Sequence, residues 1–154
     1  MAGRIEQRLA ELGITLPTPA VPIANYVPFT MAGSLLVVSG QIPLRDGAVA
    51  YAGKVGVEVG VDDAKAAARL CFINLLAQVK AAAGDLDRVK RVLRLGGFIA
   101  APASFTQHAA VMNGASDLAV EVFGDAGRHA RSTIGVPSLP ADAAVEVEGM
   151  FELG

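Results

Sequence analysis

Residues 61–83 constrain the fold most strongly, because their pattern predicts one long helix with a continuous apolar stripe. Asp62 and Asp63 suit the positive N-terminal end of such a helix, and Gly84 is placed to end it. The first half of the stripe is mostly alanine, and small side chains let a helix lie close against a sheet. We therefore expect this helix to pack on a sheet. The predicted stripe contains Ala64, Ala67, Ala68, Cys71, Leu75 and Val79, bordered by Phe72 and Leu76.

The rest of the chain supplies strands and two further helices. Because the predicted strands are mostly adjacent in the chain, we expect an α+β fold with one mostly antiparallel sheet packed by two long helices. The pattern predicts a single domain over residues 1–154, of which residues 1–21 form an N-terminal helix and a proline-rich lead-in. The predicted strands are residues 25–33, 34–43, 86–101, the stretch within 129–140 and 144–152, and the further helices are residues 5–12 and 104–123.

The composition favours a protein that assembles with further copies of itself. Apolar residues make up 53% of the chain and charged residues 18%, which is more apolar surface than one core of this size hides. Burial between subunits is one outlet for that excess. The 13 basic and 15 acidic residues give a net charge of −2, so there is no electrostatic basis for binding nucleic acid or an anionic membrane.

The sequence also favours a cytoplasmic protein over an exported or membrane-inserted one. Residues 12–44 contain no charged residue, but prolines and glycines interrupt them, and a spanning helix needs about 20 continuous apolar residues. The N-terminal residues mix both charge signs and lack the apolar core of a signal peptide. Cys71 is the only cysteine, so an intrachain disulfide is impossible and a reducing compartment is expected.

One arginine stands out in the stretch HARSTIGVPSLP, residues 129–140. If the Pro-Ser-Leu-Pro turn joins this stretch to the last strand as a hairpin, Arg131 lies opposite Glu148, and Thr133 and Glu146 share their side of the sheet. An exposed cross-strand ion pair would stabilise the fold by only ~0.2–1 kcal/mol. Alternatively, the guanidinium binds a substrate carboxylate while a glutamate positions or deprotonates water. The pattern alone favours the structural ion pair.

Several segments together resemble the RidA/YjgF-like family, also described as L-PSP endoribonuclease-like. They follow one another in the family's order over roughly residues 22–152: NYVPF, LLVVSGQIP, AAAGD, VMNGAS, ARSTIGVPSLP and AVEVEG. The resemblance implies a chorismate-mutase-like α+β fold and a homotrimer with clefts between its subunits. It also implies hydrolysis of reactive enamine or imine intermediates, of the 2-aminoacrylate type, to 2-keto acids and ammonia without a metal or organic cofactor.

The resemblance further implies roles for individual residues. Arg131 matches the arginine that binds the substrate carboxylate, and Glu148 matches the acidic residue associated with the hydrolytic water. The residues expected to line the substrate are Tyr26, Ser39, Gly40, Asn113 and Thr133. Thr133 stands where many deaminating members have cysteine, so the chain departs from the usual pattern at that position.

Three functions remain open at this stage. The first is a hydrolase similar to 2-iminobutanoate/2-iminopropanoate deaminases, acting in a cleft between subunits. The second is a non-catalytic trimer that binds a small carboxylate ligand or a partner protein in the same clefts. RNA cleavage is the least supported, because the sequence offers neither a basic patch nor a histidine pair for acid–base chemistry.

The cysteine and the two histidines do not predict a metal site, because they are too few and too scattered. Cys71 falls on the apolar stripe of the long helix, so a buried structural thiol is expected there. His129 is two residues before Arg131 and borders the predicted site, although packing at the end of a strand is the favoured interpretation.

Overall fold

A computed structural model describes residues 2–22 and 24–154 of the chain. Five strands form one sheet in the order β1-β2-β7-β5-β6, and β3 and β4 form a small hairpin beside it. The helices are α1 (Arg4–Glu11), α2 (Val61–Ala83) and α3 (His108–Phe123), with short 3-10 turns at η1 (Leu86–Arg88), η2 (Gly124–Gly127) and η3 (Pro140–Asp142). The strands are β1 (Phe29–Ala32), β2 (Leu35–Gln41), β3 (Leu44–Arg45), β4 (Ala48–Val49), β5 (Val89–Ala100), β6 (Ala130–Val136) and β7 (Val145–Leu153).

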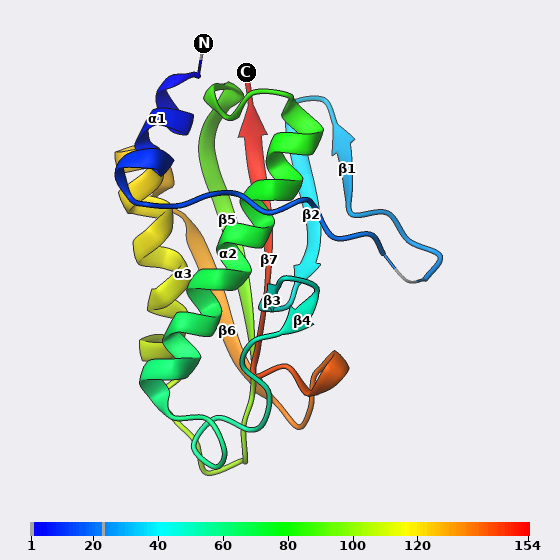
Figure 1. Cartoon of the computed structure of the whole chain (residues 1–154), viewed down its shortest axis with the longest axis vertical. Coiled ribbons are helices and arrows are strands. Elements are labelled where there is room, and N and C mark those ends of the chain that lie inside the picture. The colour runs from blue at the N-terminus through cyan, green and yellow to red at the C-terminus, as the bar shows by residue number, and fades with distance from the viewer. Residues whose placement is uncertain (1, 23) are drawn as a thin grey trace.

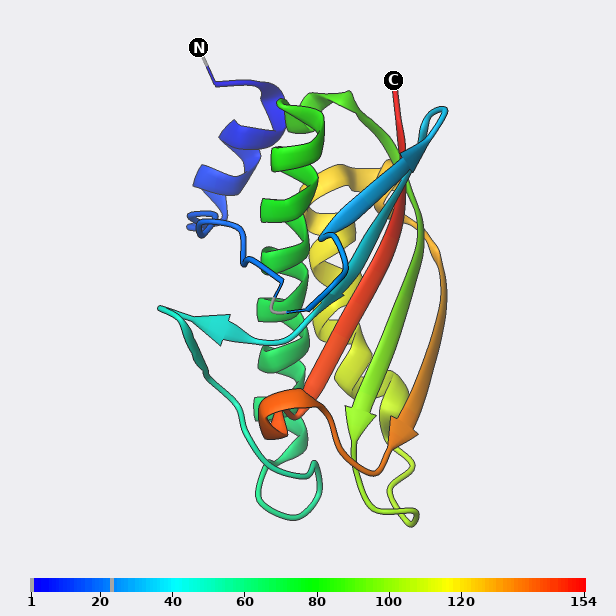
Figure 2. The same cartoon turned by 90° about the vertical axis from the view of Figure 1, so that its right-hand side faces the viewer.

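The fold has two layers, a helical layer and the sheet. Helices α2 and α3 cover one face of the sheet, and none of the helices in the described residues lies on the opposite face (Figure 1, Figure 2). Burial alternates along β7, where Val145, Val147 and Phe151 lie in the core while Glu146 and Glu148 are partly exposed on the open face. The expected α+β architecture, with one mostly antiparallel sheet and two long helices, is confirmed.

Helix α2 is the core helix that its alanine-rich stripe predicts. It runs from Val61 to Ala83, and Gly84 follows it at φ 80°, a backbone conformation that favours glycine. By length and composition alone α2 could cross a membrane, but most of its apolar residues are buried in this domain. The first predicted residues of the other long helix, 104–107, instead form a loop, so that α3 begins at His108.

The two long helices approach each other closely at a glycine of α3. A Cβ atom added to Gly114 would lie 1.9 Å from the backbone carbonyl oxygen of Lys65 in α2. No side chain fits at that distance, so Gly114 permits the contact between the helices.

The short helix α1 docks onto the rest of the domain through its N-terminal end. The carboxylate of Asp87 accepts hydrogen bonds from the backbone N–H groups of Arg4 (2.9 Å) and Ile5 (2.8 Å). These bonds hold the pKa of Asp87 below its usual value. Lys80 of α2 forms an ion pair with Glu6 at 2.7 Å, and the lead-in then crosses the outside of α2 toward β1 (Figure 1). The amide of Gln78 donates to the carbonyl of Ala20 in this segment.

The strand order overturns the predicted hairpin between residues 129–140 and the last strand. β6 pairs with β5 in a parallel arrangement, and β7 lies between β2 and β5, antiparallel to both. Ser132 aligns with Gly96 of β5, and Gly96 aligns in turn with Glu148 of β7. The prediction failed because it assumed that consecutive strands pair, whereas β7 completes the centre of the sheet.

Candidate functional site

Arg131 lies on edge strand β6 and points toward the helical layer. Its Nη1 donates two hydrogen bonds to α3, one to Oδ1 of Asn113 and one to Oγ of Ser116, each 3.0 Å long. Asn113 and Ser116 are three residues apart and therefore share one face of the helix. Both protons of Nη1 are thus engaged, and the guanidinium is held in one orientation. Asn113, predicted from the family pattern, does lie beside Arg131.

The predicted ion pair between Arg131 and Glu148 does not form. Glu148 lies on the open face of the sheet, where its carboxylate is 3.6 Å from Nη1 of Arg94, and strand β5 separates it from β6. No carboxylate lies within ion-pair distance of Arg131 among residues 2–22 and 24–154. The half-buried Arg131 therefore keeps an uncompensated positive charge, and its Nε and Nη2 donors make no hydrogen bond to the described part of the chain.

A second group of predicted residues meets on the other side of the molecule, at a bulge in β2. Val38 aligns with Gly149 of β7 but Gln41 aligns with Val147, so β2 has one extra residue there. The bulge includes Ser39, whose hydroxyl donates to the carbonyl of Val27 at 2.8 Å and fixes the segment that carries Tyr26. A hollow of about 230 Å³ opens here, and its wall includes Tyr26, Pro28, Ser39, Gly40, Pro140 and Glu146.

Glu146 is the acidic residue of this hollow, and it was not among the predicted site residues. A Cβ atom on Gly40 would lie 2.9 Å from the carboxyl carbon of Glu146, so the glycine makes room for this side chain. Partial burial, together with the nearby charge of Glu148, raises the pKa of Glu146 above its usual value. Glu146 and Glu148 both follow the alternation of β7, so the sequence alone could not show which of them lines the hollow. The bulge in β2 places Gly40 against Glu146, so Glu146 is the one that lines it.

Thr133 lies on the helical face of β6, two residues after Arg131. It aligns with Gly97, where a Cβ atom would collide with Met112 of α3. The hydroxyl oxygen of Thr133 is buried and has no hydrogen-bond partner among the described residues. In the structure, Thr133 neighbours Arg131 on the same strand face, and its hydroxyl oxygen is closed off from solvent.

Cys71 and the histidines do not form a site together. Cys71 is fully buried, its thiol lies 3.5 Å from the carbonyl oxygen of Val145, and burial raises its pKa well above the usual value. His129 contacts Ser116, whereas His108 stacks edge-to-face on Phe105 with ring centroids 5.1 Å apart. Residues 2–22 and 24–154 contain no cluster of three His, Cys, Asp or Glu side chains suited to a metal ion.

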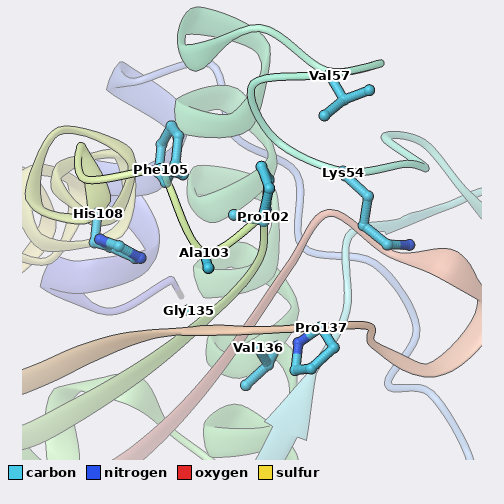
Figure 3. A pocket seen from close by; sticks show the side chains of 10 residues that line it. Lys54, Val57, Pro102, Ala103, Phe105, His108, Gly135, Val136 and Pro137 are labelled. Carbon is cyan, nitrogen blue, oxygen red and sulfur yellow. The ribbon is translucent and has the colours of Figure 1, made fainter.

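The largest hollow described lies elsewhere, at the end of the sheet where β5 and β6 finish (Figure 3). It measures about 680 Å³, and Phe105, Pro102, Val136 and Val57 give it a mainly apolar wall. Lys54 extends away from His108 in this view, and its ammonium binds Asp142 at 2.7 Å. None of the predicted site residues lines this hollow, so its size alone does not make it the functional site.

The predicted site residues therefore fall into two groups within one chain. Arg131, Asn113 and Thr133 lie at edge strand β6 under α3, whereas Tyr26, Ser39 and Gly40 lie around β2. Strands β7 and β5 separate β2 from β6. A single chain does not bring the guanidinium and the hollow together.

Comparison with known proteins identifies the family. Residues 6–153 match the family described as "YjgF/chorismate mutase-like, putative endoribonuclease". The chain belongs to the YjgF/RidA family. It is 47% identical over 153 residues to "Protein TCP17" of Trypanosoma cruzi, a match that spans 99% of this chain and 96% of that protein.

Solved structures of family members have the same fold. The protein Atu1372 from Agrobacterium tumefaciens, a protein of unknown function whose crystal structure is solved, is 50% identical; the match covers 97% of this chain and 92% of that chain, with a TM-score of 0.92. The structure of E. coli TdcF with bound serine is 25% identical, covers 89% and 94% of the two chains, and has a TM-score of 0.65. The predicted chorismate-mutase-like fold is therefore confirmed.

Proposed function

We propose that this protein hydrolyses reactive enamine or imine derivatives of small 2-keto acids, of the 2-aminoacrylate type, to the keto acid and ammonia. The observation that carries the proposal is the unpaired, oriented guanidinium of Arg131. Its Nη1 is fixed by Asn113 and Ser116, which leaves the Nε and Nη2 edge for another ligand. That edge presents two parallel N–H donors, the geometry that binds a carboxylate in a bidentate manner. Bound serine in TdcF, itself a small carboxylate, supports the same class of ligand.

Glu146 is the group that we assign to the water, in place of Glu148. Its carboxyl lines the hollow with Tyr26 and Ser39, whereas Glu148 is paired with Arg94. A raised pKa brings a carboxyl closer to the pH at which it can both accept and donate a proton. Ionised Glu146 would orient a water molecule and take one of its protons as the oxygen attacks the C=N carbon. The nitrogen of the resulting carbinolamine would take that proton back from Glu146. The C–N bond would then break to release ammonia while the hydroxyl proton passes to the ionised Glu146, which leaves the keto acid.

The complete site would form between two copies of the chain, as in a homotrimer. One copy would supply Arg131 and Asn113, and the next would supply Glu146, Tyr26 and the strand end at Ser39 and Gly40. Two observations support this arrangement. β6 is an edge strand, so another copy can approach the side of the sheet that carries Arg131. The open face of the sheet also retains apolar side chains, including Ile134, which is 53% exposed.

Activity is tested with 2-aminoacrylate generated in situ by a pyridoxal-phosphate-dependent dehydratase, with keto acid and ammonia measured. We expect Arg131→Ala to reduce kcat/KM about 10- to 100-fold, the range for lost hydrogen bonds to a charged group. Arg94→Ala is the matched control, because Arg94 is a partly exposed arginine on the neighbouring strand that already has a partner in Glu148. Equal activity of the wild type and Arg131→Ala would refute the assignment.

The location of the site between copies has its own test. Arg131→Ala and Glu146→Gln chains are each expected to retain no more than about a tenth of wild-type activity alone. After the two are unfolded and refolded together in equal amounts, about one quarter of the clefts should carry both native groups, because each cleft draws its two halves independently. No recovered activity, with mixed assembly confirmed by mass spectrometry, would contradict a shared site.

Binding without turnover is the second candidate, and Thr133 favours it. Thr133, whose hydroxyl oxygen is buried, stands where the family resemblance implies a cysteine in many deaminating members, so the surroundings of Arg131 differ from theirs. In that case the wild type would bind 2-oxobutanoate but would not accelerate ammonia release from 2-aminoacrylate. RNA cleavage, which the family description includes, is the least supported by the site, because His108 and His129 contact different parts of the fold.

A further inference from the structure

Two residues form a hydrogen-bonded chain behind Arg131: Ser116, which no site prediction included, and His129, which was expected only at the border of the site. Oγ of Ser116 lies 3.0 Å from Nη1 of Arg131 and 2.9 Å from Nε2 of His129. Nδ1 of His129 lies 2.6 Å from the carbonyl oxygen of Gly127. The chain therefore runs from the guanidinium through one hydroxyl and one imidazole to the backbone, and all of its side chains are partly buried.

For a neutral His129 ring, the direction of every hydrogen bond in this chain follows from its two ends. A carbonyl oxygen can only accept, so Nδ1 of His129 must carry a proton. In the neutral ring Nε2 is then the acceptor, and it takes the proton of the Ser116 hydroxyl. The lone pairs of that hydroxyl remain for Arg131, which can only donate. Donors and acceptors match along the whole chain, and each bond polarises the next.

The backbone around Gly127 holds the far end of this chain in place. A Cβ atom on Gly127 would lie 2.1 Å from the carbonyl oxygen of Ala119, so η2 packs directly on α3 at this glycine. This contact fixes the Gly127 carbonyl that His129 binds. The orientation of Arg131 is therefore connected, through Ser116 and His129, to a rigid part of the helical layer.

We propose that Ser116 and His129 are positioning residues, which turn the Arg131 guanidinium so that its Nε and Nη2 edge faces the ligand carboxylate. This inference rests on the proposed function only in taking Arg131 as the carboxylate-binding group. Asn113 and Ser116 each hold one proton of Nη1, so both are needed to prevent rotation about the Nε–Cζ bond. Loss of Ser116 leaves the guanidinium with a single anchor, and loss of His129 leaves the hydroxyl proton without its acceptor.

The first test measures binding of 2-oxobutanoate by isothermal titration calorimetry. We expect Ser116→Ala to raise Kd about tenfold, which corresponds to about 1.4 kcal/mol. His129→Phe should raise Kd several-fold, whereas Ser116→Thr, which keeps the hydroxyl, should stay near wild type. Ser104→Ala is the control, because Ser104 is an exposed serine in the loop before α3. In turnover assays the same variants should raise KM more than they lower kcat. Wild-type affinity in Ser116→Ala would overturn the inference while leaving the proposed function standing.

The second test needs no ligand. In ¹⁵N NMR spectra of the wild type, we expect His129 as the neutral Nδ1–H tautomer and an Arg131 Nε–H signal typical of a slowly rotating guanidinium. Ser116→Ala should accelerate that rotation, and Ser116→Thr should restore it. An Nε2–H tautomer of His129, or unchanged rotation in Ser116→Ala, would refute the positioning role whether or not the protein hydrolyses imines. Conversely, the expected spectra and affinities without any imine turnover would reject the proposed hydrolysis alone.

Discussion

Replacement of Gly114 by alanine sets two physical effects against each other. Alanine is the better helix former, by about 1 kcal/mol in a helix interior. In this fold, however, the added Cβ atom would lie 1.9 Å from the carbonyl oxygen of Lys65. Helix propensity therefore predicts a more stable protein, whereas packing between α2 and α3 predicts a less stable one.

The distance decides in favour of packing. Overpacking a well-packed core costs about 1–3 kcal/mol, and the upper end applies because the obstacle is backbone and cannot rotate away. After the gain in helix propensity, a net loss of about 2 kcal/mol in the free energy of unfolding remains. For a domain of this size such a loss corresponds to a Tm lower by about 4–8 °C.

Urea unfolding followed by circular dichroism measures the effect. The urea midpoint of Gly114→Ala should fall while the slope stays at the wild-type value, since the surface exposed on unfolding is unchanged. Gly60→Ala is the control, because Gly60 precedes α2 at φ −74° and a Cβ atom there meets nothing within 4 Å. All chains are compared at equal concentration, since assembly raises apparent stability. A Gly114→Ala protein as stable as the wild type, or more so, would show that the helices can separate without cost.

Two further predictions concern carboxylates. Burial and Glu148 raise the pKa of Glu146 from its ordinary value of 4.5, so the folded state holds the proton of Glu146 more tightly and loses stability as pH rises through that range. The urea midpoint of Glu146→Gln should thus be higher than that of the wild type at pH 7, and the two midpoints should converge below pH 4.5. An equal difference at both pH values would contradict this. Backbone hydrogen bonds lower the pKa of Asp87 from its ordinary 3.8, so its contribution is present above that value and disappears as pH falls through the lower folded pKa. Asp87→Ala should accelerate amide exchange in the first turn of α1 at pH 7, with Asp125→Ala as the control, and unchanged exchange would show that α1 docks without this carboxylate.

The parts of the fold that depend on local sequence were predictable. The helix over residues 61–83 was predicted with its observed bounds, because acidic residues begin it and a glycine at positive φ ends it. The boundary between the predicted strands 25–33 and 34–43 was likewise placed correctly, since a turn at Gly33 and Ser34 separates β1 from β2. Strand pairing was not predictable in the same way, because the last strand inserts between β2 and β5 instead of joining its neighbour in the chain.

The same distinction between local sequence and tertiary contacts decides which parts of the candidate site could be predicted. The resemblance placed Asn113 among the residues that line the substrate, and in the structure Asn113 accepts a hydrogen bond from Arg131. The pairing of Arg131 with Glu148 was wrong, because it depended on the false hairpin. The roles of Ser116 and His129 could not be foreseen, since their contact depends on how η2 folds back onto α3. Neither the helical period nor strand alternation contains that information.

The central place of β7 also determines the order in which the domain can be completed during synthesis. Of the five strands in the sheet, β7 is made last, yet both β2 and β5 pair with it. Until it leaves the ribosome, the β1–β2 hairpin and the β5–α3–β6 unit each expose an unpaired edge, and such edges promote aggregation. A nascent chain that stalls before residue 145 should therefore be a client for chaperones, whereas a chain whose β7 has left the ribosome can close its sheet in a single step.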